Sequence, residues 1–290
     1  MALSKNIKSE MSKERLEKSI DMLMLSFRVP VQKDKEEIWN SISHGISQVK
    51  EVSVVPLWKK TLRAAAVLIP FAFVAFSLTY YYVGKKEYYA QAGSQLVVIL
   101  PDSSNVLLNA DTRIEYNSAT WSFNRKVKMA GEALFTVRKG KQFSVVSGES
   151  TTQVLGTVFN VYSRGNEVRV VCLEGKVQVQ NNKTKQRVIL NPGLKTVAKE
   201  QQLAVPVEET KEAMGSWTNG EFFYSNEPLQ NVVDELSRQF NIKIKSINLK
   251  GRNYTGYFNK NNLNEALDLV CLPMKLSWIE KNGIIQVTEQ

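Results

Sequence analysis

The chain has 290 residues and a formal net charge of +10, with one histidine and two cysteines. This length predicts two or three small domains. Its basic residues alternate with apolar ones and form no dense stripe, so the composition argues against direct nucleic-acid binding. Cys172 and Cys271 lie far apart in apolar surroundings. We therefore expect two buried free thiols in preference to a disulfide framework.

Two amphipathic helices are predicted in the head, residues 1–63. The first spans 12–27, with Ser12 as its N-cap. The second begins at Asp34, with Glu37 three residues later as in a capping box. Both helices carry apolar side chains at helical spacing, and the candidates for binding a partner are Leu16, Ile20, Leu23, Phe27, Ile38, Trp39 and Ile42.

A head of this size buries little apolar surface on its own. The two helices therefore either pair as a small hairpin or present their apolar stripes to a protein partner. The periodicity leaves both arrangements open.

Residues 64–83 form a run of twenty residues without a charged side chain. Such a run is long enough to cross the ~30 Å hydrocarbon core of a bilayer as a helix. We expect one transmembrane helix here, and the alternative is a buried core helix of a soluble protein. Lys and Arg are more frequent on the N-terminal side of the run, which predicts a cytoplasmic head and a tail outside the cytoplasm.

Short apolar runs alternate with turn-forming residues between 96 and 199, which predicts an all-β antiparallel sandwich or roll. Pairs of predicted strands flank turns at 101–104, 131–132, 164–165 and 181–182. The turn at 131–132 would join strands at 126–129 and 133–137.

This region also carries a family resemblance in five ordered segments: LPDSSNVLLNADTRIEY, RKVKMAGEALFTV, FSVVSGESTTQVLGTVFNVY, VRVVCLEGKVQV and LNPGLKTVA. It resembles the periplasmic domain of the FecR family, whose members are single-pass sigma-factor regulators of the bacterial inner membrane. One turn departs from the family, because Pro101-Asp102-Ser103-Ser104 stands where the family has an acidic-Gly-Ser turn.

A polar linker is predicted at 200–216, and a weak internal repeat with an offset of 34 residues follows at 217–290. Phe223 and Tyr224 correspond to Tyr257 and Phe258, and each copy reads strand, helix, strand. The duplicated β-α-β unit resembles the STN-like fold of secretins and TonB-dependent transporters. The alternative is generic α/β patterning.

The predicted fold class is thus a multi-domain membrane protein. It has a small α-helical cytoplasmic head (1–63), one transmembrane helix (64–83), the β sandwich or roll (96–199) and an α+β domain of two β-α-β repeats (217–290).

The sequence contains none of the motifs of a multi-turnover enzyme, and His44 has no Cys or His at ligand spacing. We expect no enzymatic activity, no metal site and no cofactor. The bond between Gly156 and Thr157 is a candidate for self-cleavage, because a threonine hydroxyl can attack the preceding carbonyl, and some FecR-like regulators resemble self-cleaving proteins here. Alternatively, Gly156 permits a close backbone approach and Thr157 is an ordinary strand residue.

The resemblance implies an anti-sigma factor of the inner membrane, with its N-terminus in the cytoplasm and its C-terminal domains in the periplasm. The implied partners are an extracytoplasmic-function sigma factor, the N-terminal signalling domain of a TonB-dependent outer-membrane transporter, and site proteases that pass the signal on. The alternative is a periplasmic scaffold protein that is anchored by one helix and has no sigma partner. The two amphipathic helices favour the regulator, because an anchor needs neither.

Overall fold

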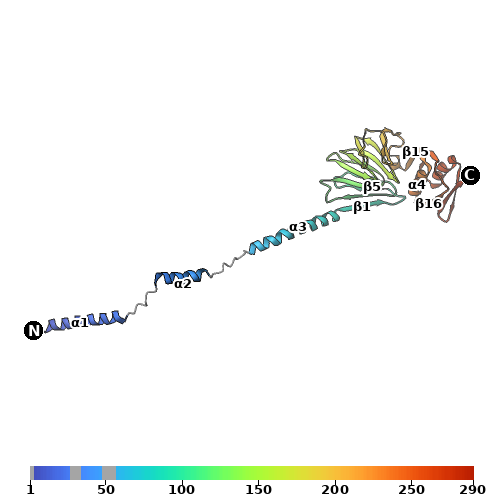
Figure 1. Ribbon diagram of the computed structural model, residues 1–290. Helices are drawn as coiled ribbons and strands as arrows, with labels where there is room; N and C mark the ends of the chain where they lie inside the picture. Colours follow the sequence, from blue (N-terminus) through green and yellow to red (C-terminus); the bar gives the residue numbers. More distant parts are fainter. Residues whose placement is uncertain (1–2, 27–33, 48–56) are drawn as a thin grey trace. The chain divides into compact units, whose positions relative to one another are not determined.

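The computed structural model describes residues 3–26, 34–47 and 57–290 (Figure 1). It divides into two compact units, Met1–Leu68 and Ile69–Gln290. The first unit contains helices α1 (Leu3–Ser26) and α2 (Lys35–Ser47) and the start of α3 (Leu57–Val83).

Helix α1 is longer than the sequence predicted. It begins at Leu3, so Ser12 lies inside the helix and is not its N-cap. A serine before charged residues also occurs inside helices, so this pattern at Ser12 predicted a start for α1 that is too late in the sequence. Helix α2 begins at Lys35, one residue after Asp34, whose carbonyl accepts the Glu37 N–H at 2.9 Å.

The predicted transmembrane helix is wrong. None of the helices in the described part of the chain combines the length and apolar character that crossing a membrane requires. The run at 64–83 is the C-terminal part of α3, and the same helix carries Lys59, Lys60 and Arg63 in its first turns. At its other end the Tyr80 hydroxyl donates to the Ala119 carbonyl of the β-rich domain at 2.9 Å. The single-pass membrane fold class is thereby replaced by a β-rich fold, with 43% of residues in strands.

Two sheets form the β-rich domain, which comprises strands β1 to β14. Their bounds are β1 Lys85–Ala90, β2 Leu96–Ile99, β3 Asn105–Leu108, β4 Thr112–Asn117, β5 Arg125–Thr136, β6 Phe143–Ser147, β7 Ser150–Val154, β8 Val158–Arg164, β9 Glu167–Glu174, β10 Val177–Asn181, β11 Arg187–Leu190, β12 Leu194–Lys199, β13 Gln202–Leu203 and β14 Val207–Glu208. One sheet contains β1, β4, β6, β7, β10 and β11 with the first half of β5, and the other contains β2, β3, β8, β9 and β12 to β14 with its second half. The predicted hairpins at 101–104, 164–165 and 181–182 are all present.

Strand β5 belongs to both sheets. Its residues 125–130 pair with β4 and β6, and its residues 131–136 pair with β3 and β8. The predicted turn at 131–132 is therefore a bend within one long strand. Gly131 makes the bend possible, because its φ of +113° suits glycine and a Cβ there would lie 2.7 Å from the Thr112 Cα.

The sandwich core lies between the two sheets. Phe135 and Phe159 stack with ring centroids 5.1 Å apart, and Phe143 packs edge-on against Phe135. Pairing includes one parallel contact, β5 with β6, in a domain that the sequence predicted to be antiparallel. Both cysteines are buried free thiols, which confirms that prediction.

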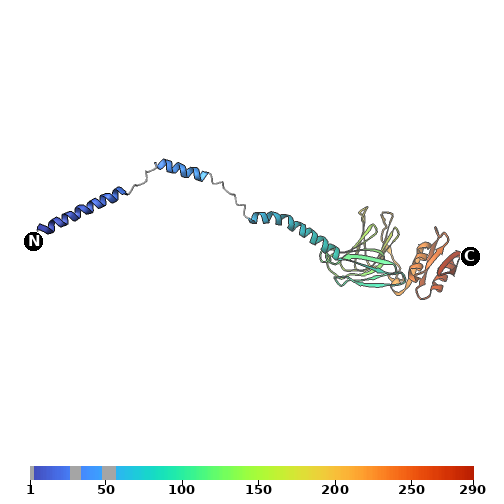
Figure 2. The same cartoon turned by 90° about the horizontal axis from the view of Figure 1, so that it is seen from below.

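The C-terminal domain follows a short 3-10 helix, η1 (Ser216–Asn219), and lies beside the β-rich domain in both views (Figures 1 and 2). Its elements are β15 Glu221–Pro228, α4 Leu229–Phe240, β16 Lys243–Ser246, β17 Asn253–Asn259, α5 Leu263–Cys271, η2 Leu272–Met274, β18 Leu276–Lys281 and β19 Ile284–Glu289. The strand-helix-strand order occurs twice, as the repeat predicted. The likeness to the STN-like fold stays a prediction.

The two copies of the repeat are interleaved. The first strands of the copies, β15 and β17, pair with each other, whereas the second strands, β16 and β18, both pair with β19. Phe223 lies directly opposite its repeat equivalent Tyr257, with ring centroids 5.9 Å apart. An antiparallel pair that aligns equivalent residues places a local two-fold axis between them, so neither copy completes its sheet alone.

We expect Gly131→Ala to destabilise the protein by roughly 2–4 kcal/mol, since the new methyl group meets the Thr112 backbone and the residue keeps a strained φ. Urea unfolding measures the change. Gly165→Ala is the matched control, because Gly165 also has a positive φ but a Cβ there meets nothing within 4 Å. If Gly131→Ala and Gly165→Ala lose the same unfolding free energy, the close contact between position 131 and Thr112 is not what destabilises the protein.

Candidate functional site

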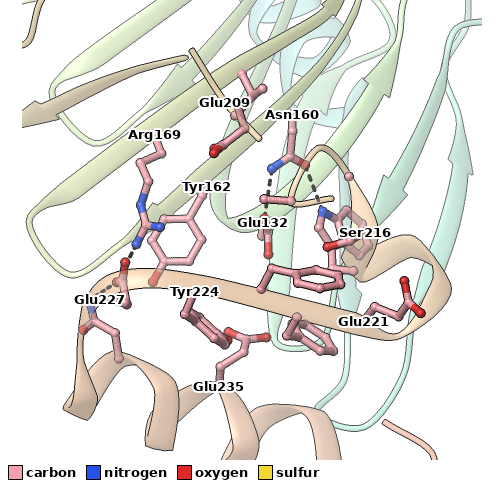
Figure 3. A pocket seen from close by; sticks show the side chains of 17 residues that line it. Glu132, Asn160, Tyr162, Arg169, Glu209, Ser216, Glu221, Tyr224, Glu227 and Glu235 are labelled. Carbon is pink, nitrogen blue, oxygen red and sulfur yellow. Dashed lines mark hydrogen bonds and ion pairs between the residues drawn. The ribbon is translucent and has the colours of Figure 1, made fainter. Parts of the chain in front are cut away.

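The interface between the β-rich and C-terminal domains holds a dense set of polar side chains. Residues on β5, β8 and β9 face β15 and α4 across a cavity of about 110 Å³ (Figure 3). We call this set the interdomain seam. Its members are Asn109, Glu132, Asn160, Tyr162, Arg164 and Arg169 from the β-rich domain and Trp217, Tyr224, Glu227, Asn231, Glu235, Arg238 and Gln239 from the C-terminal domain.

Glu132 occupies the centre of the seam. Its two carboxylate oxygens accept hydrogen bonds from the side-chain amides of Asn109 and Asn160, each at 2.9 Å. Burial raises the pKa of Glu132 above its ordinary value, and the nearby Glu235 carboxylate acts in the same direction. The two amides and Arg164 oppose this change in pKa, because they stabilise the charged form.

The amides that hold Glu132 also reach the C-terminal domain. The Trp217 indole N–H donates to the Asn160 Oδ1 at 3.1 Å, and the Gln239 amide donates to the Asn109 Oδ1 at 2.8 Å. Gln239 also donates to Glu235 at 2.7 Å. Each asparagine therefore donates to Glu132 and accepts from the other domain, which gives a chain of bonds across the interface.

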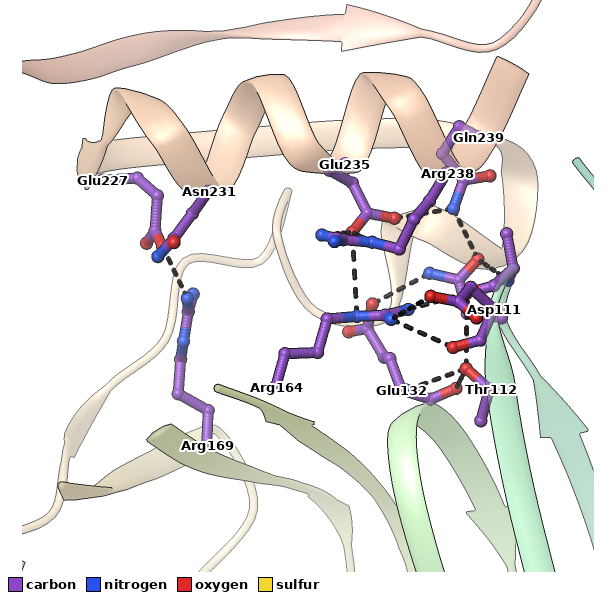
Figure 4. Close-up of polar contacts among 12 residues, drawn as sticks. Asp111, Thr112, Glu132, Arg164, Arg169, Glu227, Asn231, Glu235, Arg238 and Gln239 are labelled. Carbon is purple, nitrogen blue, oxygen red and sulfur yellow. Dashed lines mark hydrogen bonds and ion pairs between the residues drawn. The ribbon is translucent and has the colours of Figure 1, made fainter. Parts of the chain in front are cut away.

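A second group of contacts surrounds Glu235 on α4. Glu235 lies between Arg238, at 2.7 Å on its own helix, and Arg164 from β8, at 3.9 Å (Figure 4). Arg164 also donates to the carbonyls of Ala110 and Asp111 at 2.7 and 3.0 Å. This arginine therefore joins a loop and a strand of the β-rich domain to helix α4.

Arg169 forms the third connection. It donates to Glu227 at 2.7 Å, and Glu227 also accepts from Asn231 at 2.7 Å. Its guanidinium lies 4.5 Å from the centre of the Tyr162 ring. Burial opposes the charge on Arg169, but Glu227 and Glu167 outweigh this and raise its pKa.

The tyrosines of the cavity remain protonated at neutral pH. Burial raises the pKa of Tyr162 to about 12 and that of Tyr224 well above its ordinary value. Their hydroxyls therefore serve as neutral polar groups in the cavity wall.

The loop between β1 and β2 adds backbone contacts to the seam. The Gly93 N–H donates to the Arg238 carbonyl at 2.7 Å, and the Lys260 ammonium donates to the Gly93 carbonyl at 2.8 Å. Gln95 donates to the Trp217 carbonyl at 3.0 Å.

This arrangement is suited to joining two domains in one orientation. The seam carboxylates are paired with amides or guanidinium groups, and in the described residues no set of three His, Cys, Asp or Glu side chains could hold a metal ion. A different orientation of the two domains would bury several of these polar groups without partners, at about 1–3 kcal/mol each. The two domains are therefore expected to move as one body.

Two models of known families match the chain. The FecR protein model matches residues 86–178, and the FecR C-terminal model matches residues 221–287. Together they cover more than half of the sequence.

The chain belongs to the FecR family.

The seam is thus the contact between the two FecR family modules, although Trp217 lies just outside both matched ranges.

The fold is similar to that of two crystal structures of a candidate anti-sigma factor from Parabacteroides distasonis. The TM-scores are 0.66 and 0.65 at 23% sequence identity, and each match covers 71% of this chain and 99% of the other. This likeness shows a shared fold. No curated protein matches the chain.

The residues that the sequence predicted for partner binding lie far from the seam in sequence, on α1 and α2. All the described members of this set are exposed, namely Leu16, Ile20, Leu23, Ile38, Trp39 and Ile42. Phe27 lies outside the described residues. Their role in binding stays a prediction.

Gly156 and Thr157 lie between β7 and β8. A Cβ on Gly156 would come within 2.6 Å of the Lys139 Cα, so glycine is required for this backbone approach. Thr157 is buried, its hydroxyl donates to the Lys176 carbonyl at 3.0 Å, and its backbone pairs with Val137. This geometry favours the structural role of Gly156 and Thr157 over self-cleavage.

Sequence reasoning missed the seam. It interpreted Glu132 as part of a turn and did not single out Asn109 or Asn160. The available signal was the position of Asn160 between Phe159 and Val161 in an apolar strand, where asparagine is unusual. A polar residue in such a position generally marks a buried contact.

The raised pKa of Glu132 predicts a pH dependence of stability. The folded-state pKa lies above the unfolded one, so this carboxyl contributes stability below about pH 4.3 and loses that contribution as the pH rises through the folded pKa. The unfolding free energy of Glu132→Gln, relative to wild type, should therefore increase with pH across that window.

Urea unfolding at pH steps from 4 to 8 tests this. Glu221→Gln is the control, because Glu221 lines the same cavity but is exposed. If the unfolding free energies of wild type and Glu132→Gln change with pH in parallel, Glu132 has the same pKa in the folded and unfolded states, which would contradict the prediction.

We expect wild type and Thr157→Ala each to give one full-length band on a denaturing gel, since the Thr157 hydroxyl is engaged with Lys176. Loss of that hydrogen bond should lower stability by about 0.5–1.5 kcal/mol. Two fragments in wild type that disappear in Thr157→Ala would instead establish self-cleavage at Gly156-Thr157.

Proposed function

We propose that this FecR-family protein is an anti-sigma regulator. Its head binds an extracytoplasmic-function sigma factor through α1 and α2, and its two-domain tail receives the signal. The observation that carries the proposal is the exposure of large apolar side chains along both helices. The similar fold of the candidate anti-sigma factor from Parabacteroides distasonis supports the same role.

The exposed stripes need a partner. Trp39 is 70% exposed, Leu23 59% and Ile42 47%. Each such side chain gains about 1.5–3 kcal/mol when it is fully buried. No described side chain of α1 or α2 is buried. An apolar groove that receives an amphipathic helix is a common form of such recognition.

The tail is proposed to contact the N-terminal signalling domain of a TonB-dependent outer-membrane transporter. The C-terminal domain offers β16 and β18 as edge strands of its three-stranded sheet, and an edge strand can pair with a strand of a partner. Because the seam joins this domain to the β-rich domain, contact at the edge would affect both.

The compartment of the tail is part of the proposal. We place residues 86–287 in the periplasm without relying on α3 as a membrane span, because none of the described helices meets that requirement. An alkaline phosphatase fused after Gln290 should be active, and an inactive fusion would overturn the assignment of the tail.

Binding of a sigma factor from the same genome tests the head. Full-length wild type should bind it, and Leu23→Asp with Trp39→Ala should weaken binding at least a hundredfold, because each lost anchor is worth a tenfold factor or more. The matched control is Met22→Asp with Asn40→Ala, which alters the helix faces away from the stripes. The activity of a sigma-dependent reporter should change in Leu23→Asp with Trp39→Ala and stay as in wild type in the control double variant.

Equal affinity of both double variants would show that the stripes do not form the interface. Failure of wild type to bind any of the genome's sigma factors would favour the scaffold function. In a separate titration, the transporter's N-terminal signalling domain is added to wild type and to the head variants. Its affinity should be the same for all of them. A negative result with the signalling domain alone would remove only the transporter contact.

A further inference from the structure

A second cavity, of about 340 Å³, lies at one end of the β sandwich. It opens where the β6–β7 hairpin meets β9 and β12. The residues that form its walls include Gly148, Ser150, Gly165, Val168, Asn181 and Ala198. No residue of the interdomain seam belongs to its lining.

The inward-facing residues change character toward this cavity. On β6 the inward positions run Phe143, Val145, Ser147, and on β7 they run Val154, Thr152, Ser150 in the same direction. On β10 two inward valines are followed by Asn181. Three neighbouring strands thus replace apolar core residues with hydroxyls and an amide at one end of the sandwich.

Three of these hydroxyls are buried and unpaired. The side chains of Ser147, Ser150 and Thr152 are at most 1% exposed, and in the described part of the chain none has a hydrogen-bond partner. Ser147 and Ser150 lie opposite each other in the hairpin register, and Ser150 lines the cavity. A buried hydroxyl without a partner is costly, and such groups in folded proteins call for an explanation.

Other polar side chains nearby are satisfied within the protein. The Thr196 hydroxyl, on β12, donates to the Ala204 carbonyl at 2.7 Å, and Thr151, on the outward face of β7, donates to Asn182 at 2.8 Å. The unpaired hydroxyls are therefore confined to the inward face beside the cavity.

We propose that this cavity binds a small neutral molecule that is rich in hydroxyl groups, such as a polyol or a monosaccharide. Hydroxyls both donate and accept, so serine and threonine suit a ligand with the same chemistry. The charged groups at the rim oppose each other in sign, with Glu149 paired to Lys183 and Lys199 beside Glu200, which favours a neutral ligand. The volume lies within the range of small-molecule sites.

The test uses the full-length protein with glucose, N-acetylglucosamine and mannitol as separate probes, followed by ligand-observed NMR and calorimetry. At least one probe should bind with a millimolar or lower Kd. Ser150→Ala should weaken that binding about fivefold, because Ser150 lines the cavity and its hydroxyl is then lost to the ligand. Ser144→Ala removes a hydroxyl from the outward face of β6 and should change affinity less than twofold.

A separate variant tests whether the hydroxyls beside the cavity are unpaired. Thr152→Val replaces an unpaired hydroxyl with a methyl group of similar shape, and it should raise the Tm by about 2–4 °C without ligand. Failure of all three probes to bind at 50 mM would overturn the proposal, as would unchanged affinity in Ser150→Ala. An unchanged or lower Tm in Thr152→Val would show that the hydroxyl is satisfied and remove the physical basis of the site.

Discussion

The bend of β5 at Gly131 is the constraint on which both the sandwich and the seam depend. The strand leaves one sheet at Ala130 and enters the other at Gly131. This crossing places the next residue, Glu132, on the outer face of the second sheet. There its backbone exchanges hydrogen bonds with the Thr112 hydroxyl at 3.0 and 3.1 Å. Gly131, which lets β5 cross between the two sheets, therefore also positions the Glu132 carboxylate at the centre of the interface.

The seam illustrates how a buried charge can specify an orientation. Removing a carboxylate from water is costly, and well-placed donors can only offset that cost. Asn109 and Asn160 offset it on one side, and their own acceptors are filled by Gln239 and Trp217 from the C-terminal domain. Any other docking angle would leave these groups unpaired. The seam thus provides specificity in the relative position of the two domains.

The repeat in the C-terminal domain shows a related dependence between parts. Because β15 pairs with β17 and Phe223 stacks on its equivalent Tyr257, the duplicated halves complete each other's sheets. The apolar core of this domain extends to Leu107 and Leu134 on the β-rich domain. Hydrophobic contact holds the domains together, and the polar seam fixes how they meet.

The sequence alone determined the local features of this protein. Three of the hairpin turns, the two-fold repeat, the free thiols and the family were all readable, because each depends on residues that are close in sequence or on ordered motifs. The apolar run at 64–83 showed the limit of such patterns: hydropathy predicted a membrane span, whereas α3 is a longer helix with a basic start, and none of the described helices meets the requirement for a span. Only the tertiary structure decided that residues 126–136 form one bent strand, since a glycine bend and a turn have the same composition. It alone brought Glu132, Asn160, Trp217 and Glu235 together, because these residues are separated by up to about a hundred positions and hydrogen bonds between distant segments leave no periodicity in the chain.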